Sequence, residues 1–297
     1  MGRALAEAVP AARLVFEEVD DALDENLSRL IFEGDEADLT LTENAQPALM
    51  AVSLAVARAL EGEGGIRLAD VSAYVAGHSL GEYSALCAAG ALDLAETARL
   101  LKRRGQAMQR AVPPGEGAMA ALIGVAREGA ETIATVASEA GVCVVANDNA
   151  PGQVVVSGAR AAVERAVAIA PDHGARRAML LPVSAPFHCP LMAPAAEAMA
   201  EALADAPIAP PTVPLVANVT AEPVSEPETI RILLVEQVTA VVRWRDSIVY
   251  MRDHGVETVI ELGAGRVLAG LAKRIDRAID TCSVATPDEL EALLKAL

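Results

Sequence analysis

Gly77-His78-Ser79-Leu80-Gly81 is a G-x-S-x-G sequence between an apolar segment and a run of small residues. This context is typical of a nucleophile elbow, in which the glycines let the chain turn sharply and expose the serine hydroxyl. A helix that begins at Leu80 would also direct backbone N–H groups toward an oxyanion. The five-residue pattern alone is weak, and an ordinary tight turn before a helix is the alternative. In this context, the pattern predicts that Ser79 is a nucleophile.

A serine nucleophile needs a general base, and the chain has only four histidines. His78 adjoins Ser79 and is expected to point away from its hydroxyl. His173 and His254 lie in polar segments that are typical of a surface. His188 lies in the apolar segment SAPFHCPLM and is the best candidate for the base, with a hydrogen-bonded structural histidine as the alternative. No carboxylate stands out as a third triad member, and a backbone carbonyl could orient the imidazole as well.

Three consecutive basic residues, Lys102, Arg103 and Arg104, follow the elbow within a predicted helix. Basic residues at a helix end are usually solvated, and we expect this for two of the three. One arginine turned inward could bind a carboxylate through two parallel hydrogen bonds. Arg104 is therefore the candidate for binding an anionic group near Ser79.

The segments that must position these residues alternate between predicted helix and strand. The chain opens with an amphipathic helix over residues 3–24, which Pro10 divides in two. A short, partly β-branched segment over residues 70–76 is a candidate buried strand that leads into the elbow. Further helices are predicted over 42–59, 80–90, 93–109, 190–204, 230–238, 245–254 and after Gly265 through Ile279, with strands over 212–219 and 258–262.

The middle of the chain has a different pattern. Strand and helix candidates follow one another there in the order β-α-β-β-α-β, which is typical of a ferredoxin-like module. Proline-rich segments bound it on both sides. The strands are predicted over 118–125, 142–146, 153–157 and 177–181, and the helices over 128–140 and 159–170. The sequence therefore predicts an α/β protein whose large catalytic subdomain comprises residues 1–114 and 184–297, with residues 115–183 forming a small subdomain.

Composition sets limits on the class of protein. Hydrophobic residues make up 53% of the 297 residues and aromatic residues only 2%, so the core must consist mainly of Ala, Val, Leu and Ile. Such a core suits helices packed on a parallel sheet. The net charge of −17 makes nucleic acid a poor partner, because phosphate binding depends on Lys and Arg. An anionic substrate would need a local basic patch.

Cysteine spacing and hydropathy bear on localisation. The cysteines Cys87, Cys143, Cys189 and Cys282 lie far apart and lack the spacing of a zinc site, so we expect free thiols in a reducing compartment. The N-terminus lacks the basic start and apolar run of a signal peptide, and no apolar stretch is long enough to span a bilayer. These features predict a cytoplasmic enzyme that binds neither nucleic acid nor membrane.

Five segments together resemble malonyl-CoA:acyl carrier protein transacylases, the acyltransferase family of fatty acid and polyketide synthesis. The resemblance covers essentially the whole chain, and the motifs in this order are highly specific. The segments are GHSLGEYSALCAAGALDLAETARLLKRRGQAMQ (77–109), NDNAPGQVVVSG (147–158), PVSAPFHCPLM (182–192), VRWRDSIVYM (242–251) and ELGAGRVLAGLAKRI (261–275).

The resemblance implies an α/β-hydrolase-like large subdomain with an inserted ferredoxin-like small subdomain. It also implies ping-pong transfer of a malonyl group from malonyl-CoA to an acyl carrier protein, without a metal or redox cofactor. Ser79 would attack the malonyl thioester, and His188 would take the serine proton and later activate the phosphopantetheine thiol. Arg104 would bind the malonyl carboxylate. We expect the enzyme to be a monomer.

Three further roles follow from the resemblance. A main-chain carbonyl that corresponds to Gln237 would orient the histidine, which would explain the missing acid. The Leu80 N–H would supply one oxyanion donor. Phe187, directly before the histidine, would crowd an α-methyl group and favour malonyl over methylmalonyl. One methyl group in a pocket changes the binding free energy by about 1–3 kcal/mol, so this would be a preference.

Two positions depart from the family pattern. Family members usually begin with a strand that ends in G-Q-G-x-Q, whose last glutamine is a second oxyanion donor, and Met1 corresponds to a position just after it. We therefore expect either a start site upstream of Met1 or a shortened, impaired enzyme. The usual Asn-Pro before V-x-W is Ala240-Val241 here. The alternatives to malonyl transfer are a serine hydrolase or thioesterase on the same elbow and an impaired homologue that binds carrier protein.

Overall fold

Helices make up almost all of the segment before residue 112 in the structure, a computed structural model that describes Met1–Leu297. Pro10 occupies the first position of the second helix, where its missing N–H is tolerated, and so divides the predicted N-terminal helix. Asp93 caps the long helix that carries Arg104 by accepting a hydrogen bond from Glu96 N. These helices are α1 (Arg3–Ala8), α2 (Pro10–Leu23), α3 (Leu27–Glu33), α4 (Glu36–Leu39), α5 (Thr42–Gly64), α6 (Leu68–Val71), α7 (Gly81–Ala88) and α8 (Leu94–Ala111).

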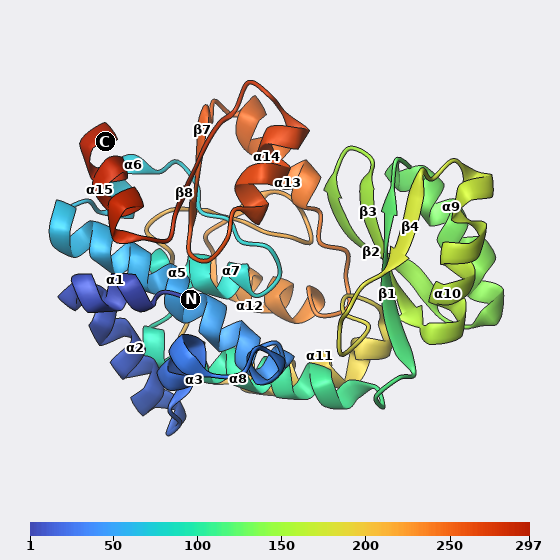
Figure 1. The fold of residues 1–297 in the computed structure, drawn as a ribbon, viewed down its shortest axis with the longest axis horizontal. Coiled ribbons are helices and arrows are strands. Elements are labelled where there is room, and N and C mark those ends of the chain that lie inside the picture. The colour runs from blue at the N-terminus through green and yellow to red at the C-terminus, as the bar shows by residue number, and fades with distance from the viewer.

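Helix α5 lies in the centre of the larger body and packs against α2, α7 and α8 (Figure 1). Most of its middle residues are buried aliphatic side chains, as the low aromatic content predicts. Gly105 lets α8 approach the start of α5, because a Cβ there would come within 2.5 Å of Glu43 Cα. This close approach places Arg104 beside the first turns of α5.

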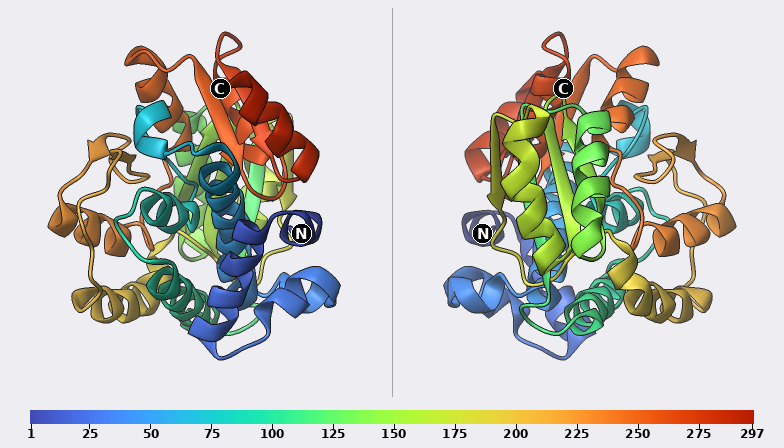
Figure 2. Two further views of the ribbon diagram at one scale, coloured as in Figure 1. Left: turned by 90° about the vertical axis from the view of Figure 1, so that its left-hand side faces the viewer. Right: turned by 90° about the vertical axis from the view of Figure 1, so that its right-hand side faces the viewer.

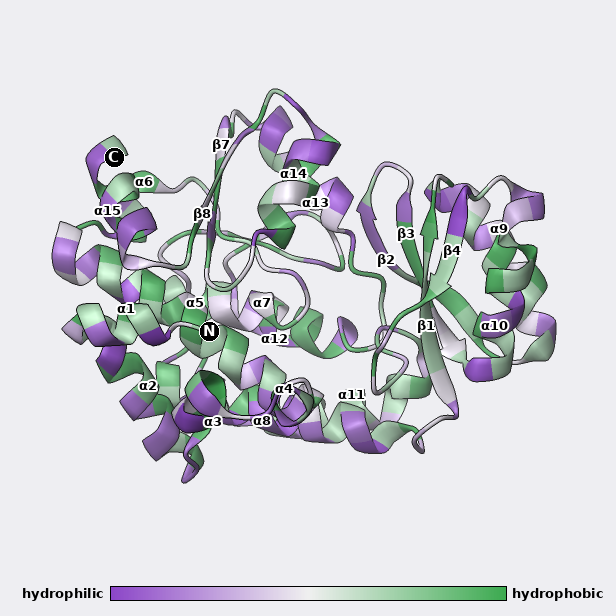
Figure 3. Ribbon diagram, in the orientation of Figure 1, coloured by the Kyte–Doolittle hydropathy of each residue, from purple (hydrophilic) through white to green (hydrophobic).

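The middle of the chain forms the ferredoxin-like unit that the β-α-β-β-α-β pattern predicts. Its antiparallel sheet has the strand order β2-β3-β1-β4. Figure 2 shows α9 and α10 side by side on the outer face of this sheet, and Figure 3 shows their mixed apolar and polar sides. The elements are β1 (Gly117–Ile123), α9 (Arg127–Ala137), η1 (Ser138–Ala140), β2 (Cys143–Ala150), β3 (Gln153–Ala159), α10 (Arg160–Ile169), η2 (Ala170–His173) and β4 (Arg177–Leu180).

The last third of the chain returns to the larger body. β7 and β8 pair in parallel, whereas β5 and β6 form a short antiparallel pair. No helix combines the length and apolar character needed to cross a bilayer. The elements are η3 (Pro190–Met192), α11 (Ala193–Ala204), β5 (Leu215–Val216), β6 (Pro223–Val224), α12 (Pro227–Glu236), α13 (Trp244–Asp253), β7 (Thr258–Leu262), α14 (Val267–Ile275), β8 (Asp280–Val284) and α15 (Pro287–Ala296).

The α/β class is confirmed, but three predicted elements of the larger body differ. The first residues of the strand predicted over 70–76 belong to α6. The rest of this segment pairs only through an isolated parallel bridge between Val75 and Leu215 and forms no continuous ladder. The strand predicted over 212–219 shortens to β5 for the same reason. The last predicted helix was extended too far: it ends at Ile275, where Asp276 turns extended, and leads into β8.

Candidate active site

The sharp turn expected of a nucleophile elbow is present at Ser79, and backbone geometry enforces it. Ser79 has a φ of 54°, in the left-handed region that non-glycine residues rarely adopt. Gly77 cannot be replaced without moving the chain, because a Cβ there would lie 1.9 Å from Gly81 O. A Cβ on Gly81 would meet nothing within 4 Å. The first glycine of the motif therefore permits the sharp turn, and α7 starts directly behind the serine.

Ser79 and His188 form a hydrogen-bonded pair although 109 residues separate them. Ser79 Oγ lies 2.9 Å from His188 Nε2, and His188 Nδ1 lies 2.8 Å from the carbonyl oxygen of Gln237. A carbonyl oxygen only accepts, so Nδ1 carries the proton and Nε2 is free to accept the serine proton. Burial, reinforced by the Arg104 charge, lowers the pKa of His188 to about 3. The imidazole is therefore neutral at physiological pH and able to accept a proton at Nε2.

The other three histidines lie away from the Ser79 hydroxyl, as the sequence predicts. His78 points away from the Ser79 hydroxyl, with Nε2 2.8 Å from Asn149 Oδ1 on β2. Burial lowers the pKa of His78, which makes it a neutral hydrogen-bonded residue. His173 and His254 are exposed. His188 is thus the one histidine in contact with the nucleophile.

Arg104 turns inward and is 1% exposed. Its Nη2 donates to Ser79 Oγ at 3.0 Å and to Gln237 Oε1 at 2.8 Å, while Nη1 donates to Gln46 Oε1 at 2.7 Å. The guanidinium also lies over the ring of Tyr83, 5.8 Å from its centroid. All of these hydrogen-bond partners are neutral, and Glu82 acts on the guanidinium electrostatically but forms no direct ion pair with it. A buried positive charge with no directly paired carboxylate, beside the Ser79 hydroxyl, suits an anionic ligand.

The two neighbouring basic residues turn away from the site, Arg103 as an exposed residue and Lys102, contrary to expectation, as a largely covered one whose side chain is 13% exposed. Lys102 Nζ lies 2.6 Å from Glu25 Oε2, and Arg103 Nη2 lies 3.2 Å from Glu201 Oε2. The expectation that only one of the three basic residues turns toward the site is confirmed.

The backbone N–H that follows Ser79 has no hydrogen-bond partner. The Leu80 N–H donates to no group of the protein, whereas the Ser79 N–H is taken by Asn218 Oδ1 at 2.8 Å. Leu80 lies at the N-terminus of α7, where the helix dipole favours negative charge. A tetrahedral oxyanion on the carbon bonded to Ser79 would find this donor unoccupied.

Sequence analysis did not identify the polar residues that support these groups. Gln46, Glu82 and Asn218 are each at most 3% exposed and hydrogen-bonded within the site. Of these three, only Glu82 could have been identified from the sequence, because it lies three residues after Ser79, at the start of α7. Asn218 and Gln46 lie in segments with no motif, so their roles depend on long-range contacts alone. Ala240 and Val241 leave the Gln237 carbonyl within hydrogen-bond distance of the histidine.

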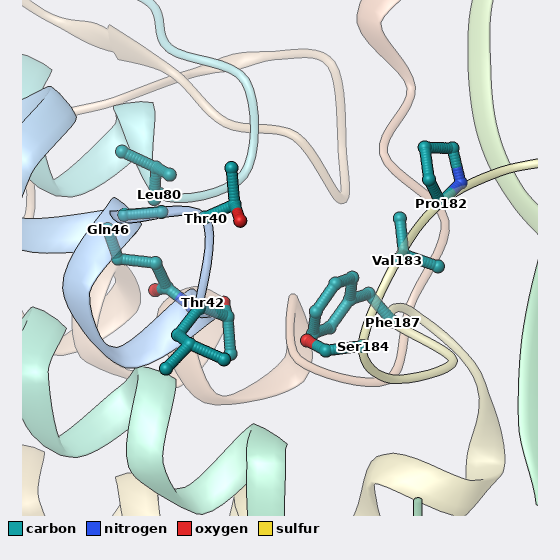
Figure 4. Close-up of a pocket in the computed structure, with 10 residues that line it drawn as sticks. Thr40, Thr42, Gln46, Leu80, Pro182, Val183, Ser184 and Phe187 are labelled. Atoms are coloured by element: carbon teal, nitrogen blue, oxygen red, sulfur yellow. Dashed lines mark hydrogen bonds between the residues drawn. The ribbon is translucent and has the colours of Figure 1, made fainter. Parts of the chain in front are cut away.

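A cavity of about 290 Å³ opens beside the nucleophile. Figure 4 shows its two walls: Thr40, Thr42, Gln46 and Leu80 on one side, and the segment from Pro182 to Phe187 on the other. Phe187, whose position beside the base the sequence predicts, lines this cavity. The wall with Gln46 mixes polar and apolar side chains, and the facing wall is largely apolar.

Comparisons with known proteins agree with this geometry. A model of the acyl transferase domain matches residues 1–286. The malonyl CoA-acyl carrier protein transacylase of Bacillus subtilis (strain 168) is 45% identical over 100% of this chain and 92% of the relative. That of Escherichia coli (strain K12) is 43% identical over 99% and 93%.

Solved structures give the same result. The acyl-carrier-protein-S-malonyltransferase of Bartonella henselae superposes with a TM-score of 0.97 at 56% identity, over 100% of this chain and 94% of that one. A malonyl-transacylase in complex with its type II PKS acyl-carrier protein superposes with a TM-score of 0.95 at 39% identity, over 99% and 94%. The chain therefore belongs to the acyl transferase domain family.

Proposed function

We propose that this protein transfers a malonyl group from malonyl-CoA to the phosphopantetheine thiol of an acyl carrier protein, through a malonyl ester on Ser79. The observation that carries the proposal is the buried, unpaired guanidinium of Arg104, 3.0 Å from the hydroxyl of a serine that is hydrogen-bonded to a neutral histidine. The full-length relatives named above act in the same reaction class.

In the first half-reaction, Ser79 Oγ attacks the thioester carbonyl carbon of malonyl-CoA while His188 Nε2 accepts the hydroxyl proton. The imidazolium that forms is stabilised by the Gln237 carbonyl on Nδ1. The carbonyl oxygen becomes an oxyanion, to which the Leu80 N–H donates. Collapse of this intermediate breaks the carbon–sulfur bond, and His188 returns its proton to the departing coenzyme A thiolate.

The second half-reaction reverses these steps with a new thiol. The phosphopantetheine thiol of the carrier protein gives its proton to His188 and its sulfur attacks the malonyl ester. Ser79 leaves with the proton that His188 returns, so the enzyme ends as it began. Exchange of one thiol for another makes the two transfers chemically alike, and one base serves both.

Arg104 distinguishes this reaction from ester hydrolysis. The carboxylate of a malonyl group is separated from the reacting carbon by one methylene, so it can reach a guanidinium that already touches Ser79 Oγ. A charge-assisted pair would replace hydrogen bonds to neutral groups. A neutral ester has no anionic group that could pair with this guanidinium. We therefore favour an acyl chain that ends in a carboxylate, with Phe187 restricting substituents next to the carbonyl.

We place the reaction in the cytoplasm. Four cysteines are free, and three of them are buried. Free thiols persist in a reducing compartment, which supports this assignment.

Intact-mass measurement after mixing with malonyl-CoA tests the proposal. The protein should gain the mass of one malonyl group, and Ser79→Ala should gain none. The adduct should survive in water and disappear when an acyl carrier protein with a phosphopantetheine arm is added. Rapid loss of the adduct in water alone would indicate a hydrolase, and absence of any adduct would contradict malonyl transfer.

A further inference from the structure

Glu82 is a fully buried carboxyl directly beneath the nucleophile elbow. Its side chain is 1% exposed, and it lies on the first turn of α7, three residues after Ser79. Burying a carboxyl is unfavourable unless hydrogen bonds compensate. Both of its oxygens accept such bonds, one from the backbone of Asn218 and one from the side chain of Gln237. Neither step of the reaction described above uses Glu82.

The first oxygen of Glu82 acts on the nucleophile through Asn218. The Asn218 N–H donates to Glu82 Oε1 at 2.5 Å. The Asn218 side chain in turn accepts from Ser79 N at 2.8 Å and donates to Gly77 O at 2.8 Å. Asn218 therefore holds the backbone on both sides of the strained turn, and Glu82 holds Asn218.

The second oxygen acts on the base through Gln237. Gln237 Nε2 donates to Glu82 Oε2 and to Ser79 O, so its Oε1 faces Arg104. The carbonyl of the same residue accepts from His188 Nδ1. Fixing the side chain of Gln237 thus restrains the carbonyl that selects the histidine tautomer. The same amide also holds Arg104 in place.

We propose that Glu82 is the positioning residue that holds Ser79 and His188 in register, by binding Asn218, which supports Ser79, and Gln237, which supports His188, with one carboxyl oxygen each. The two partners come from segments far apart in the chain, and Glu82 is the one side chain bonded to both supports. The proposal rests on the proposed function only for the identity of the acyl group that Ser79 carries. The contacts of Glu82 with Asn218 and Gln237 do not depend on it. It deepens that function by adding a residue that touches no substrate.

A fluorophosphonate ester tests the proposal without any malonyl group, because this probe reacts with an activated serine hydroxyl. Glu82→Gln keeps the size of the side chain but sets an amide donor against Asn218 N or Gln237 Nε2. We expect the rate of Ser79 labelling to fall by about tenfold to a hundredfold, because small misplacements of reacting groups cause losses of this size. Asp148→Asn is the matched control, because it removes another buried carboxylate, 3.0 Å from Arg245, that makes no contact with the pair.

Nitrogen-15 spectra of the histidines give a readout that a merely structural role would not move. Only four histidines contribute signals. In the wild type and in Asp148→Asn, His188 should show one neutral tautomer with the proton on Nδ1. In Glu82→Gln the Nε2–H tautomer should become populated, because the Gln237 carbonyl is no longer held in place.

Folded Glu82→Gln with wild-type labelling and an unchanged His188 spectrum would overturn the proposal. Should that variant fail to fold, Glu82→Asp keeps the carboxyl group and withdraws its oxygens by one methylene, and the same loss of labelling is expected. Wild-type labelling of folded Glu82→Asp would also overturn it. If the wild type reacts with the probe but not with malonyl-CoA, malonyl transfer fails while the positioning role is still decided by the variants.

Discussion

The two sides of Ser79 are built differently. On the inner side, Arg104, Glu82, Gln237 and Asn218 are each at most 1% exposed and joined by hydrogen bonds. On the outer side, the segment that leads into α5 and the segment from Pro182 to Phe187 line an open cavity. The inner side fixes the Arg104 charge, the His188 tautomer and the Ser79 backbone before any ligand binds. The outer side contributes only the shape of the cavity.

This difference predicts how sensitive each side is to substitution. Buried polar groups that satisfy one another lose more than a single contact when one member is removed, because the partners stay buried and unpaired. Side chains that line an open cavity lose only the contact itself. Changes on the inner side should therefore alter the chemistry, and changes on the outer side should alter the choice of acyl group.

The largest effect is expected for the base. His188→Ala removes the acceptor for the Ser79 proton while leaving the elbow intact. The rate of malonyl-enzyme formation should fall by at least about 10²–10⁴-fold, the usual contribution of a general base. Rapid quenching followed by intact-mass measurement gives this rate. His173→Ala, at an exposed histidine, is the control, and a loss as large as that of His188→Ala there would contradict the assignment.

The next effect concerns the charge of the inner side. Arg104→Met removes the guanidinium but fills most of its volume. Loss of a charge-assisted hydrogen-bonded pair costs about 1.5–3 kcal/mol, so malonyl transfer should fall about tenfold to 150-fold. Transfer of acetyl groups should be retained or rise, because no buried positive charge then needs a counter-ion. Competition between malonyl-CoA and acetyl-CoA measures this ratio. An unchanged ratio would rule out Arg104 as the carboxylate site.

The protonation state of the base can be tested by pH. Because burial lowers the pKa of His188 to about 3, its ring signals should remain those of the neutral form from pH 8 down to pH 5. A titration midpoint near the ordinary value of about 6.5 would contradict this environment. The base should therefore stay available for acylation throughout that range.

The same shift affects stability in a defined direction. Below about pH 6.5 the unfolded chain binds a proton at this histidine that the folded chain does not bind, so the free energy of unfolding falls as the pH drops toward 3. Burial raises the pKa of Glu82, against the opposing effect of the hydrogen bonds from Asn218 and Gln237, and this shift acts in the opposite sense as the pH falls toward the ordinary value near 4.5. Urea unfolding of wild type and His188→Gln separates the two, because the variant lacks only the histidine contribution.

The inner and outer sides also differ in how far the sequence predicts them. Local patterns indicated most of the longer helices and the ferredoxin-like unit, because periodicity acts within a few residues. Ser79, His188 and Arg104 were found from residue type and resemblance. Asn218 and Gln46 were not, since they reach Ser79 or Arg104 from 139 and 58 residues away. The strand β8 was missed because its five residues carry too little pattern to distinguish it from the end of a helix.

The smallest effect on malonyl transfer is expected on the outer side, at Phe187. Replacing it with alanine removes a ring that lines the cavity beside His188. The hydrogen bonds among Ser79, Glu82, Gln237 and Asn218 stay intact. Malonyl transfer should change little, whereas methylmalonyl transfer should rise. One methyl group alters selectivity by about 1–3 kcal/mol, so the ratio of the two kcat/KM values should shift by at most about 10–200-fold. Equal losses for both substrates would show instead that Phe187 supports the base, and would move this residue from the outer side of the comparison to the inner one.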